Sequence, residues 1–513
     1  MLFNSNAFVF GFLPVTLLLF HLAGRLGTRQ AIVVLTLASF VFYAWDSLAA
    51  LPILLLSIVF NFLTGSLICE GGSRRIRFLT PRVLVTAGIA ANLCALGFYK
   101  YLNLLIELAN AARGLAGWHP LAAVDVYLPT GISFFTFTQI AYLVDCYRHR
   151  VTDRSPADYA LFVSFFPHLI AGPLLYHGNI IPQFRQFIRE SLDTQKIAIG
   201  IATFAIGLSK KIFLADNLGY YVNAVYRTVE MGAEPMLFVA WVATLGYTFQ
   251  LYFDFSGYSD MAIGLALLFG VVIPINFNSP YQATGIIEFW RRWHISLSNF
   301  LRDYLYIPLG GNRLGELRKY CNIFVTMLLG GLWHGASWTF ALWGALHGTL
   351  LLLNHLSHRL WPRLVIPGPV AWLVTFACIN LTWIVFRSPD LATAQRMTLG
   401  LFGLNGISVP EGMAALPLFQ TLFPDAKYFG IWQGINGGIG TAGTIEIVGL
   451  IALCFVIAVF LPNTAQQLPV ADRAAGVMRR LVRSRVAGIL VGILFWLSVM
   501  NFSKPSPFLY FRF

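Results

Sequence analysis

Long apolar runs follow one another along the chain from residue 7 to Met500, separated by short polar links. A helix needs about 20 apolar residues to cross the hydrocarbon core of a bilayer. Runs of about this length lie near residues 7–23, 31–46, 50–69, 83–106, 127–146, 157–176, 196–216, 236–255, 257–275, 320–337, 338–355, 369–387, 445–461 and 486–500. Because glycine or proline interrupts several of them, we expect about 10 to 14 full crossings by tilted or broken helices.

The composition points to the same class. Hydrophobic residues make up 57% of the 513 residues and charged residues only 11%, whereas soluble globular chains carry about 25% charged residues. The polar and apolar residues show none of the alternation that is typical of membrane strands. The chain is therefore predicted to be an all-α polytopic integral membrane protein.

Basic residues mark the links expected to face the cytoplasm, because loops on that side carry an excess of Lys and Arg. Arg25 and Arg29 follow the first run, and Asp46 stands alone in the link between the second and third runs. Basic clusters at residues 74–82 and 473–485 follow the third run and precede the last one. This pattern predicts that both termini lie outside the cytoplasm. The basic cytoplasmic loops of a protein embedded in membrane lipid also account for the net charge of +13, so the charge does not indicate binding of nucleic acid.

Three segments are expected to depart from regular spanning helices. Residues 391–444 are Gly-rich and nearly uncharged, which predicts an extracytoplasmic cap with re-entrant pieces. Proline and glycine break the apolar runs at 129–135 and 166–173, and such backbone is tolerated at membrane depth where it is buried in protein or lines a cavity. In the last of these segments, His168 is expected to bond carbonyls that the prolines leave free.

Neither a disulfide framework nor a metal site is indicated. The six cysteines are scattered and show no C-x-x-C spacing. His347, His355 and His358 are spaced like one helix face, but no carboxylate accompanies them, so no metal is expected there. We also expect no tightly bound cofactor.

Two carboxylates, Asp254 and Asp260, stand inside an apolar stretch, where ionisable groups are costly and suggest function. The favoured interpretation is structural: they cap a helix that starts at Gly257, or they pair with Arg291 and Arg292. A paired acid dyad is disfavoured, because side chains six residues apart point to different faces of a helix.

The most distinctive stretch runs from Phe289 to Gly348 and holds two histidines, each directly after a tryptophan. His294 follows two arginines, whereas His334 lies in the apolar sequence GGLWHG without a charged neighbour. Glycine lets backbone or a ligand approach closely. A buried neutral imidazole can act as a base toward a hydroxyl group, as acyl transfer requires. A histidine that merely bonds a broken helix remains the alternative.

Taken together, the motifs resemble the membrane-bound O-acyltransferase family, in particular its bacterial polysaccharide-acetylating members. The resemblance rests on PTGISFFTFTQIAYLVD, FPHLIAGPL, LYFDFSGYSDMAIG, NFNSPY, FWRRWHISLSNFLRDYLYIPLGGNR, GGLWHGASWTFALWGALHG and the ending FLYFRF. It spans nearly the whole chain and is weakest between residues 391 and 485.

The resemblance implies one transmembrane domain over residues 1–513, with a ring of tilted helices around a thin centre where funnels from both sides meet. The core would be 83–360, with the catalytic region at 285–348 and an aromatic tail at 501–513. The family's near-invariant histidine corresponds to His334 and its second histidine to His294. Tyr510, in the tail, corresponds to a tyrosine that receives the acyl group first in related systems.

By the same resemblance, the chain would move acetyl from cytoplasmic acetyl-CoA across the bacterial inner membrane, and an extracytoplasmic partner protein would complete transfer to an exported, alginate-like polysaccharide. Arg291, Arg292 and Arg302 would attract the CoA phosphates, although cytoplasmic topology explains these basic residues equally well. Alternatives within the class are D-alanyl transfer to teichoic acid and acylation of peptidoglycan or cellulose. A proton-coupled transporter using Asp254 and Asp260, or an inactive scaffold, would be a different class.

Overall fold

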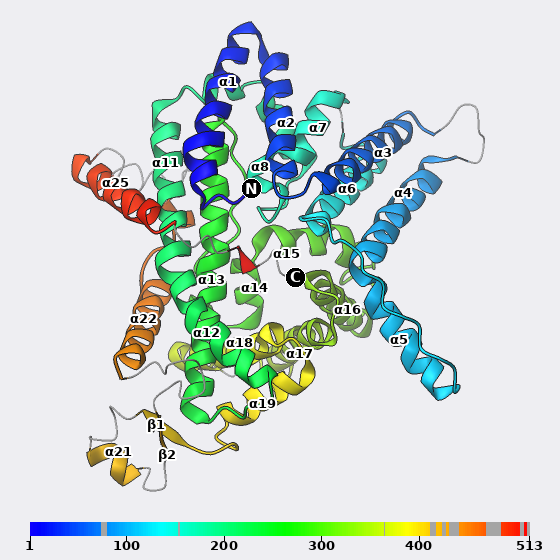
Figure 1. Ribbon diagram of the computed structural model, residues 1–513. Helices are drawn as coiled ribbons and strands as arrows, with labels where there is room; N and C mark the ends of the chain where they lie inside the picture. The colour runs from blue at the N-terminus through cyan, green and yellow to red at the C-terminus, as the bar shows by residue number, and fades with distance from the viewer. Residues whose placement is uncertain are drawn as a thin grey trace.

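The computed structural model describes residues 1–72, 79–151, 154–363, 365–410, 417–422, 427–429, 441–467, 484–502 and 507–509. Within these ranges the protein is built from helices, which confirms the all-α prediction (Figure 1). The only strands in the described ranges are β1 (Ser408–Pro410) and β2 (Lys427–Phe429), which pair in parallel.

The helices before residue 231 are α1 (Leu13–Leu26), α2 (Thr28–Ala44), α3 (Leu51–Cys69), α4 (Pro81–Leu96), α5 (Leu102–Leu115), α6 (Ile132–Tyr147), α7 (Pro156–Ser164), α8 (Phe166–Leu169), α9 (His177–Phe184), α10 (Phe187–Glu190), α11 (Thr194–Ser209) and α12 (Asp216–Glu230). A π-helical turn, Lys210–Ala215, joins α11 to α12. The later helices are α13 (Leu237–Leu268), α14 (Ile286–Arg292), α15 (Ile295–Leu301), α16 (Glu316–His334), α17 (Trp338–Leu360), α18 (Gly368–Arg387), α19 (Leu391–Leu401), α21 (Pro417–Leu422), α22 (Thr441–Phe460), α23 (Thr464–Gln467) and α25 (Arg485–Met500).

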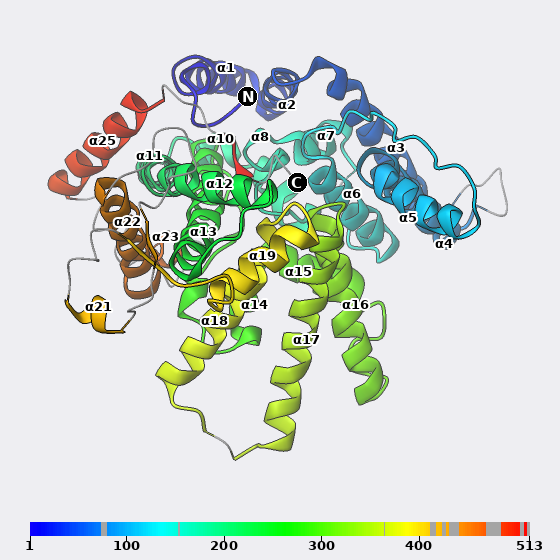
Figure 2. The same ribbon diagram turned by 60° about the horizontal axis from the view of Figure 1, so that its bottom comes forward.

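Helix α13 runs through the middle of the molecule, with α11 along one side of it (Figures 1 and 2). The sequence predicted two spans here, with a new helix starting at Gly257, and that boundary is wrong: α13 is one helix of 32 residues. Gly257 instead serves close packing. A Cβ atom on Gly257 would lie 2.7 Å from the carbonyl oxygen of Gly207 in α11, and one on Gly207 would lie 2.5 Å from the carbonyl oxygen of Gly257.

The outer helices present large apolar side chains at the surface. Leu56 in α3 is 71% exposed, and Ile489 and Trp496 in α25 are 62% and 60% exposed. Among the described residues, five helical stretches have the length and apolar composition needed to cross a bilayer. They are Ala7–Leu26, Leu48–Cys69, Pro81–Leu115, Thr194–Glu230 and Gly368–Arg387. Shorter apolar helices accompany them, so the protein is a multi-pass membrane protein whose exposed apolar belt suits lipid.

The broken run near 157–176 forms two short helices, α7 and α8, followed by irregular backbone. His168 Nε2 lies 2.9 Å from the carbonyl oxygen of Phe162, at hydrogen-bond distance, which confirms the expected structural contact. The predicted cap at 391–444 falls partly outside the described residues, and the described part holds α19, β1, α21, β2 and the start of α22. The cap and the single-domain organisation stay predictions.

Candidate active site

The helices α16 and α17 form a tight hairpin that carries His334 at its bend. Glycines on the facing sides make this contact possible. A Cβ atom on Gly331 would lie 2.4 Å from the carbonyl oxygen of Phe340, and one on Gly344 would lie 2.5 Å from that of Met327. Real Cβ atoms do not approach backbone oxygens so closely. The glycines near His334 therefore allow the backbones of α16 and α17 to pack directly against each other.

His334 is the last residue of α16, and its side chain is buried in a cage of aromatic rings. The ring centroid lies 5.0 Å from that of Trp333, 5.2 Å from that of Trp343 and 5.3 Å from that of Phe386. The rings of Trp343 and Phe386 meet the imidazole nearly edge to face, an arrangement that stabilises aromatic pairs. Such a cage fixes the imidazole and excludes bulk water.

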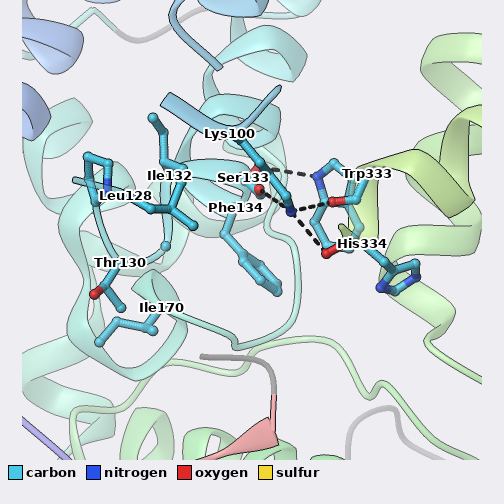
Figure 3. A pocket seen from close by; sticks show the side chains of 11 residues that line it. Lys100, Leu128, Thr130, Ile132, Ser133, Phe134, Ile170, Trp333 and His334 are labelled. Carbon is cyan, nitrogen blue, oxygen red and sulfur yellow. Dashed lines mark hydrogen bonds between the residues drawn. The ribbon is translucent and has the colours of Figure 1, made fainter. Parts of the chain in front are cut away.

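Two side chains from the α4–α5 connection hold the end of α16. The amine of Lys100 donates to the carbonyl oxygens of Trp333 at 2.7 Å and His334 at 3.0 Å, and it contacts the hydroxyl of Ser133 at 3.3 Å. The hydroxyl of Tyr101 donates to the carbonyl oxygen of Leu332 at 2.6 Å. These carbonyls lack partners within the helix because it ends there. Figure 3 shows that Lys100 grips the backbone while the ring of His334 turns away from it.

His294 faces His334 across the centre of the protein. The two ring centroids are 6.3 Å apart, and His294 is fully buried. Its ring also meets Phe255 of α13 at 4.7 Å, edge to face. The structure therefore brings together the two histidines that the sequence singled out, from the α14–α15 corner and the α16–α17 bend. Whether they act in catalysis stays a prediction.

The backbone of His294 adopts the left-handed conformation, with φ 42° and ψ 54°. This region is unfavourable for residues other than glycine, and such strain persists only where the surroundings impose it. Here Asn276 imposes it: its carbonyl oxygen accepts from Ile295 N at 3.0 Å, and its Oδ1 accepts from Ser296 Oγ at 2.7 Å. Ser296 Oγ in turn accepts from Leu174 N at 3.0 Å.

The two intramembrane carboxylates are paired, but not as predicted. Asp254 Oδ1 lies 2.7 Å from Lys211 Nζ, and Asp260 Oδ2 lies 2.7 Å from Lys210 Nζ. The predicted cap at Gly257 and the pairing with Arg291 and Arg292 are therefore wrong. The reason is that α13 continues past Gly257, which turns both carboxylates toward the π-helical turn between α11 and α12. Lys211 also pairs with Asp216, at 2.7 Å.

The C-terminal segment is fixed to this cluster. Leu509 N donates to Asp254 Oδ2 at 3.0 Å, and Lys211 Nζ donates to the carbonyl oxygen of Pro507 at 3.3 Å. Phe508 is buried against Tyr258, with ring centroids 4.5 Å apart. Figures 1 and 2 both show the segment 507–509, in red, in the middle of the helix assembly. Tyr510 itself lies outside the described residues.

Two cavities border these elements. The smaller measures about 60 Å³ and lies on the Lys100 side of the α16 terminus (Figure 3). Its lining residues are Lys100, Leu128, Pro129, Thr130, Gly131, Ile132, Ser133, Phe134, Ile170, Trp333 and His334. The larger measures about 490 Å³ and borders the C-terminal segment. Its lining residues are Lys211, Ile212, Phe213, Asp216, Asn217, Gly219, Tyr220, Asn223, Gln250, Asp254, Asn501, Pro507 and Leu509.

The three candidate donor-binding arginines line neither cavity. Arg292 pairs with Glu288 at 2.8 Å, and Arg302 pairs with its neighbour Asp303 at 2.7 Å, whereas Arg291 is exposed. Burial opposes ionisation of Glu288, but hydrogen bonds from Thr284 and Arg292 outweigh it and hold the pKa of this carboxyl below its usual value. Binding of an anionic donor by these arginines stays a prediction.

Trp290 Nε1 donates to His347 Nδ1 at 3.2 Å, which places His347 in the aromatic packing below Trp343. Across the residues described, no group of three or more His, Cys, Asp or Glu side chains is placed to hold a metal ion.

Sequence reasoning missed Lys100, Tyr101 and Lys211 as parts of the site. Two of them carried a usable signal: Lys100 and Lys211 are ionisable residues inside predicted spans, a placement that suggests a specific partner. Tyr101 and the cage residue Phe386 carried none, because aromatic residues are common throughout this chain.

Comparison with known proteins matches residues 83–388 to the model of MBOAT, the membrane-bound O-acyltransferase family. A peptidoglycan O-acetyltransferase of Helicobacter pylori is 41% identical over 80% of this chain and 81% of its own length. A probable alginate O-acetylase of Pseudomonas putida is 38% identical over the full length of both chains. A teichoic acid D-alanyltransferase of Streptococcus thermophilus is 26% identical over 44% of this chain and 56% of its own. The buried histidine pair and these matches lead to one conclusion: the chain is an acyltransferase that belongs to the membrane-bound O-acyltransferase family.

Proposed function

We propose that this enzyme transfers acetyl from cytoplasmic acetyl-CoA toward an exported, alginate-like polysaccharide, and that an extracytoplasmic partner protein completes the transfer. Relatives named as probable alginate O-acetylases, two of which match over the full length of the chain, support this acceptor class. The enzyme would lie in the bacterial inner membrane with both termini outside, as the distribution of basic residues predicts.

The chemistry assigns one role to each histidine. His334 accepts the proton of the attacking hydroxyl, whose oxygen forms a bond to the thioester carbonyl carbon. The carbon–sulfur bond then breaks, and the proton passes on to the departing CoA thiolate. His294, 6.3 Å away from ring to ring, positions the donor and stabilises the charge that develops on the carbonyl oxygen. Arg291, Arg292 and Arg302 attract the CoA phosphates.

One observation carries the proposal: two buried imidazoles lie 6.3 Å apart between their ring centroids, and the C-terminal segment is bound to the helix that packs on one of them. Asp254 binds Leu509, and the next residue of α13, Phe255, packs on His294. The segment and His294 therefore contact successive residues of the same helix. Tyr510, which follows Leu509 in the sequence, is therefore the proposed first acyl acceptor.

The test uses purified full-length enzyme and acetyl-CoA labelled in the acetyl group. We expect an ester-linked label on Tyr510, detected by peptide mass spectrometry and released by hydroxylamine. Tyr510→Phe keeps the ring and removes only the hydroxyl, so both the label and polymer acetylation should be lost. Normal polymer acetylation by Tyr510→Phe would refute the relay, and absence of CoA release by the wild-type enzyme would refute acetyl-CoA as donor.

A second acceptor is favoured by a specific observation. The peptidoglycan O-acetyltransferase relative covers four-fifths of the chain at 41% identity, so peptidoglycan is the main alternative acceptor. Acetate released by mild alkali from purified exopolysaccharide and from purified cell wall, in wild-type and deletion strains, distinguishes the two. The transporter alternative gains no support, because Asp254 and Asp260 each pair with a lysine.

A further inference from the structure

Two lysine–carboxylate pairs link the same two elements, and only one of them touches the C-terminal segment. Lys210 pairs with Asp260 and also donates to Thr464 Oγ1 at 2.9 Å, in α23. Lys211 pairs with Asp254, and both of these side chains bond the backbone of residues 507–509. One pair therefore ties helices together, whereas the other also holds the end of the chain.

The pair Lys211–Asp254 is deeply buried, and both of its side chains form hydrogen bonds to the backbone of the C-terminal segment. The side chains of Lys211 and Asp254 are 2% and 3% exposed. One carboxylate oxygen of Asp254 binds Lys211, and the other accepts from Leu509 N. The ammonium of Lys211 also lies 4.8 Å from the ring centroid of Phe508, within cation–π range. Removing two charges from water is costly unless their hydrogen-bonding positions are filled, and the segment fills two of them.

The contact between the pair and the segment lies between two features of the protein, His294 and a large cavity. On one side, Asp254 is followed by Phe255, which packs on His294. On the other side, Lys211, Asp254, Pro507 and Leu509 all line the cavity of about 490 Å³. Polar side chains dominate the rest of that lining, and the buried Oε1 of Gln250 has no hydrogen-bond partner among the described residues. The segment therefore borders a largely polar cavity, and the helix that binds it also packs on His294.

We propose that Lys211 and Asp254 form a clamp that positions the C-terminal segment 507–509 for the acyl transfer assigned to Tyr510. The inference rests on the proposed function. In the first step the phenol oxygen bonds the acetyl carbon, the thioester carbon–sulfur bond breaks, and the phenol proton ends on CoA. In the second step a hydroxyl oxygen of the acceptor bonds that carbon, the phenyl ester bond breaks, and the hydroxyl proton returns to the phenol.

The clamp is tested by replacing each charge pair with apolar residues of similar size in the full-length enzyme. The variant Lys211→Met/Asp254→Leu removes the clamp, and the only carboxylate that loses its lysine partner, Asp216, has a side chain that is 22% exposed. The matched control, Lys210→Met/Asp260→Leu, removes the neighbouring pair on the same elements. Leu509→Cys, added to each background, reports exposure of the segment through the rate at which its thiol reacts with a maleimide, read at that site by mass spectrometry.

We expect the reporter thiol at position 509 to react about tenfold to a hundredfold faster in the clamp variant than in the control, since a hydrogen bond to a charged group contributes about that factor. Labelling of Tyr510 from acetyl-CoA, measured without the reporter, should fall by a similar factor in the clamp variant only, while donor binding is retained. These two positioning residues would then affect kcat and leave KM for acetyl-CoA unchanged.

Equal maleimide rates in the two variants, at equal protein yield, would overturn the clamp. A clamp variant that fails to accumulate is replaced by Asp254→Asn, which keeps the size of the side chain and removes its charge, with the same expected direction. The relay fails separately: if Tyr510→Phe acetylates polymer normally while the clamp variant still exposes the reporter thiol, the clamp stands as an anchor and the acyl-carrying role is rejected.

Discussion

Replacing Lys100 with methionine tests how the position of His334 is maintained. Methionine keeps an unbranched apolar side chain and removes the amine that bonds the carbonyl oxygens of Trp333 and His334. A buried acceptor left without a donor costs about 1–3 kcal/mol. Two such carbonyls would cost about 2–6 kcal/mol if α16 kept its present end. The end of the helix is therefore expected to rearrange, and the imidazole moves with it.

A small displacement should be costly for the reaction. A misplacement of about 1 Å can reduce a rate by about a hundredfold. We expect Lys100→Met to reduce kcat for acetyl transfer by at least tenfold, with KM for acetyl-CoA nearly unchanged because the lysine holds backbone. The assay is steady-state release of CoA by purified enzyme, with a thermal unfolding scan of the same preparations.

Tyr101→Phe is the graded comparison for this prediction. It removes one hydrogen bond, to the carbonyl oxygen of Leu332 in the last turn of α16, and leaves both Lys100 contacts. A single hydrogen bond of this kind contributes about 0.5–1.5 kcal/mol, so its effect on kcat should be smaller than that of Lys100→Met. Wild-type kcat in Lys100→Met, or a rise in KM alone, would refute the positioning role.

Three further substitutions probe the same centre. His334→Ala should lower polymer acetylation by about 10²–10⁴, the usual contribution of a general base, with normal protein level in a membrane immunoblot. His294→Asn removes the imidazole with a residue that tolerates its left-handed backbone, and it should impair turnover less completely; unchanged turnover and unchanged binding of labelled acetyl-CoA would assign His294 to the scaffold. Gly344→Leu should lower the midpoint of thermal unfolding, because its Cβ would lie 2.5 Å from the carbonyl oxygen of Met327.

The sequence predicted the class correctly and singled out two histidines that the structure brings together, for identifiable physical reasons. Apolar run length is fixed by the thickness of the bilayer, so most spans agree with observed helices. Histidines in apolar surroundings are rare enough to stand out, and the rings of His294 and His334 do lie close together, with centroids 6.3 Å apart. His168 was also assigned correctly, because proline-broken backbone needs a donor or acceptor nearby.

The sequence-based prediction was wrong where a glycine can either start a helix or allow two helices to pack closely. Gly257 was taken as the start of a helix, although it allows α11 to pack against an unbroken α13. That error also misdirected Asp254 and Asp260, whose lysine partners lie more than 40 residues earlier in the chain. Contacts of this kind depend on which helix faces meet, and the spacing of residues along one chain does not reveal them.

The position of the histidine centre along the length of α6 determines how far donor and acceptor must travel to reach it. Lys100, which holds His334, contacts Ser133 at the first turn of α6, whereas Arg148 follows the last turn. A helix of 16 residues is about 24 Å long. Arg148 lies in a link that also holds Arg150 and Arg154, and basic links favour the cytoplasmic side. If Arg148 faces the cytoplasm, then His334 lies near the outer end of α6, where Thr130 also bonds Asp46 at 3.3 Å. A cytoplasmic thioester must then reach most of the way through the protein, while the acyl group has only a short way to leave. This asymmetry favours a donor with a long flexible arm, such as CoA, and makes a short carrier segment at the outer side sufficient.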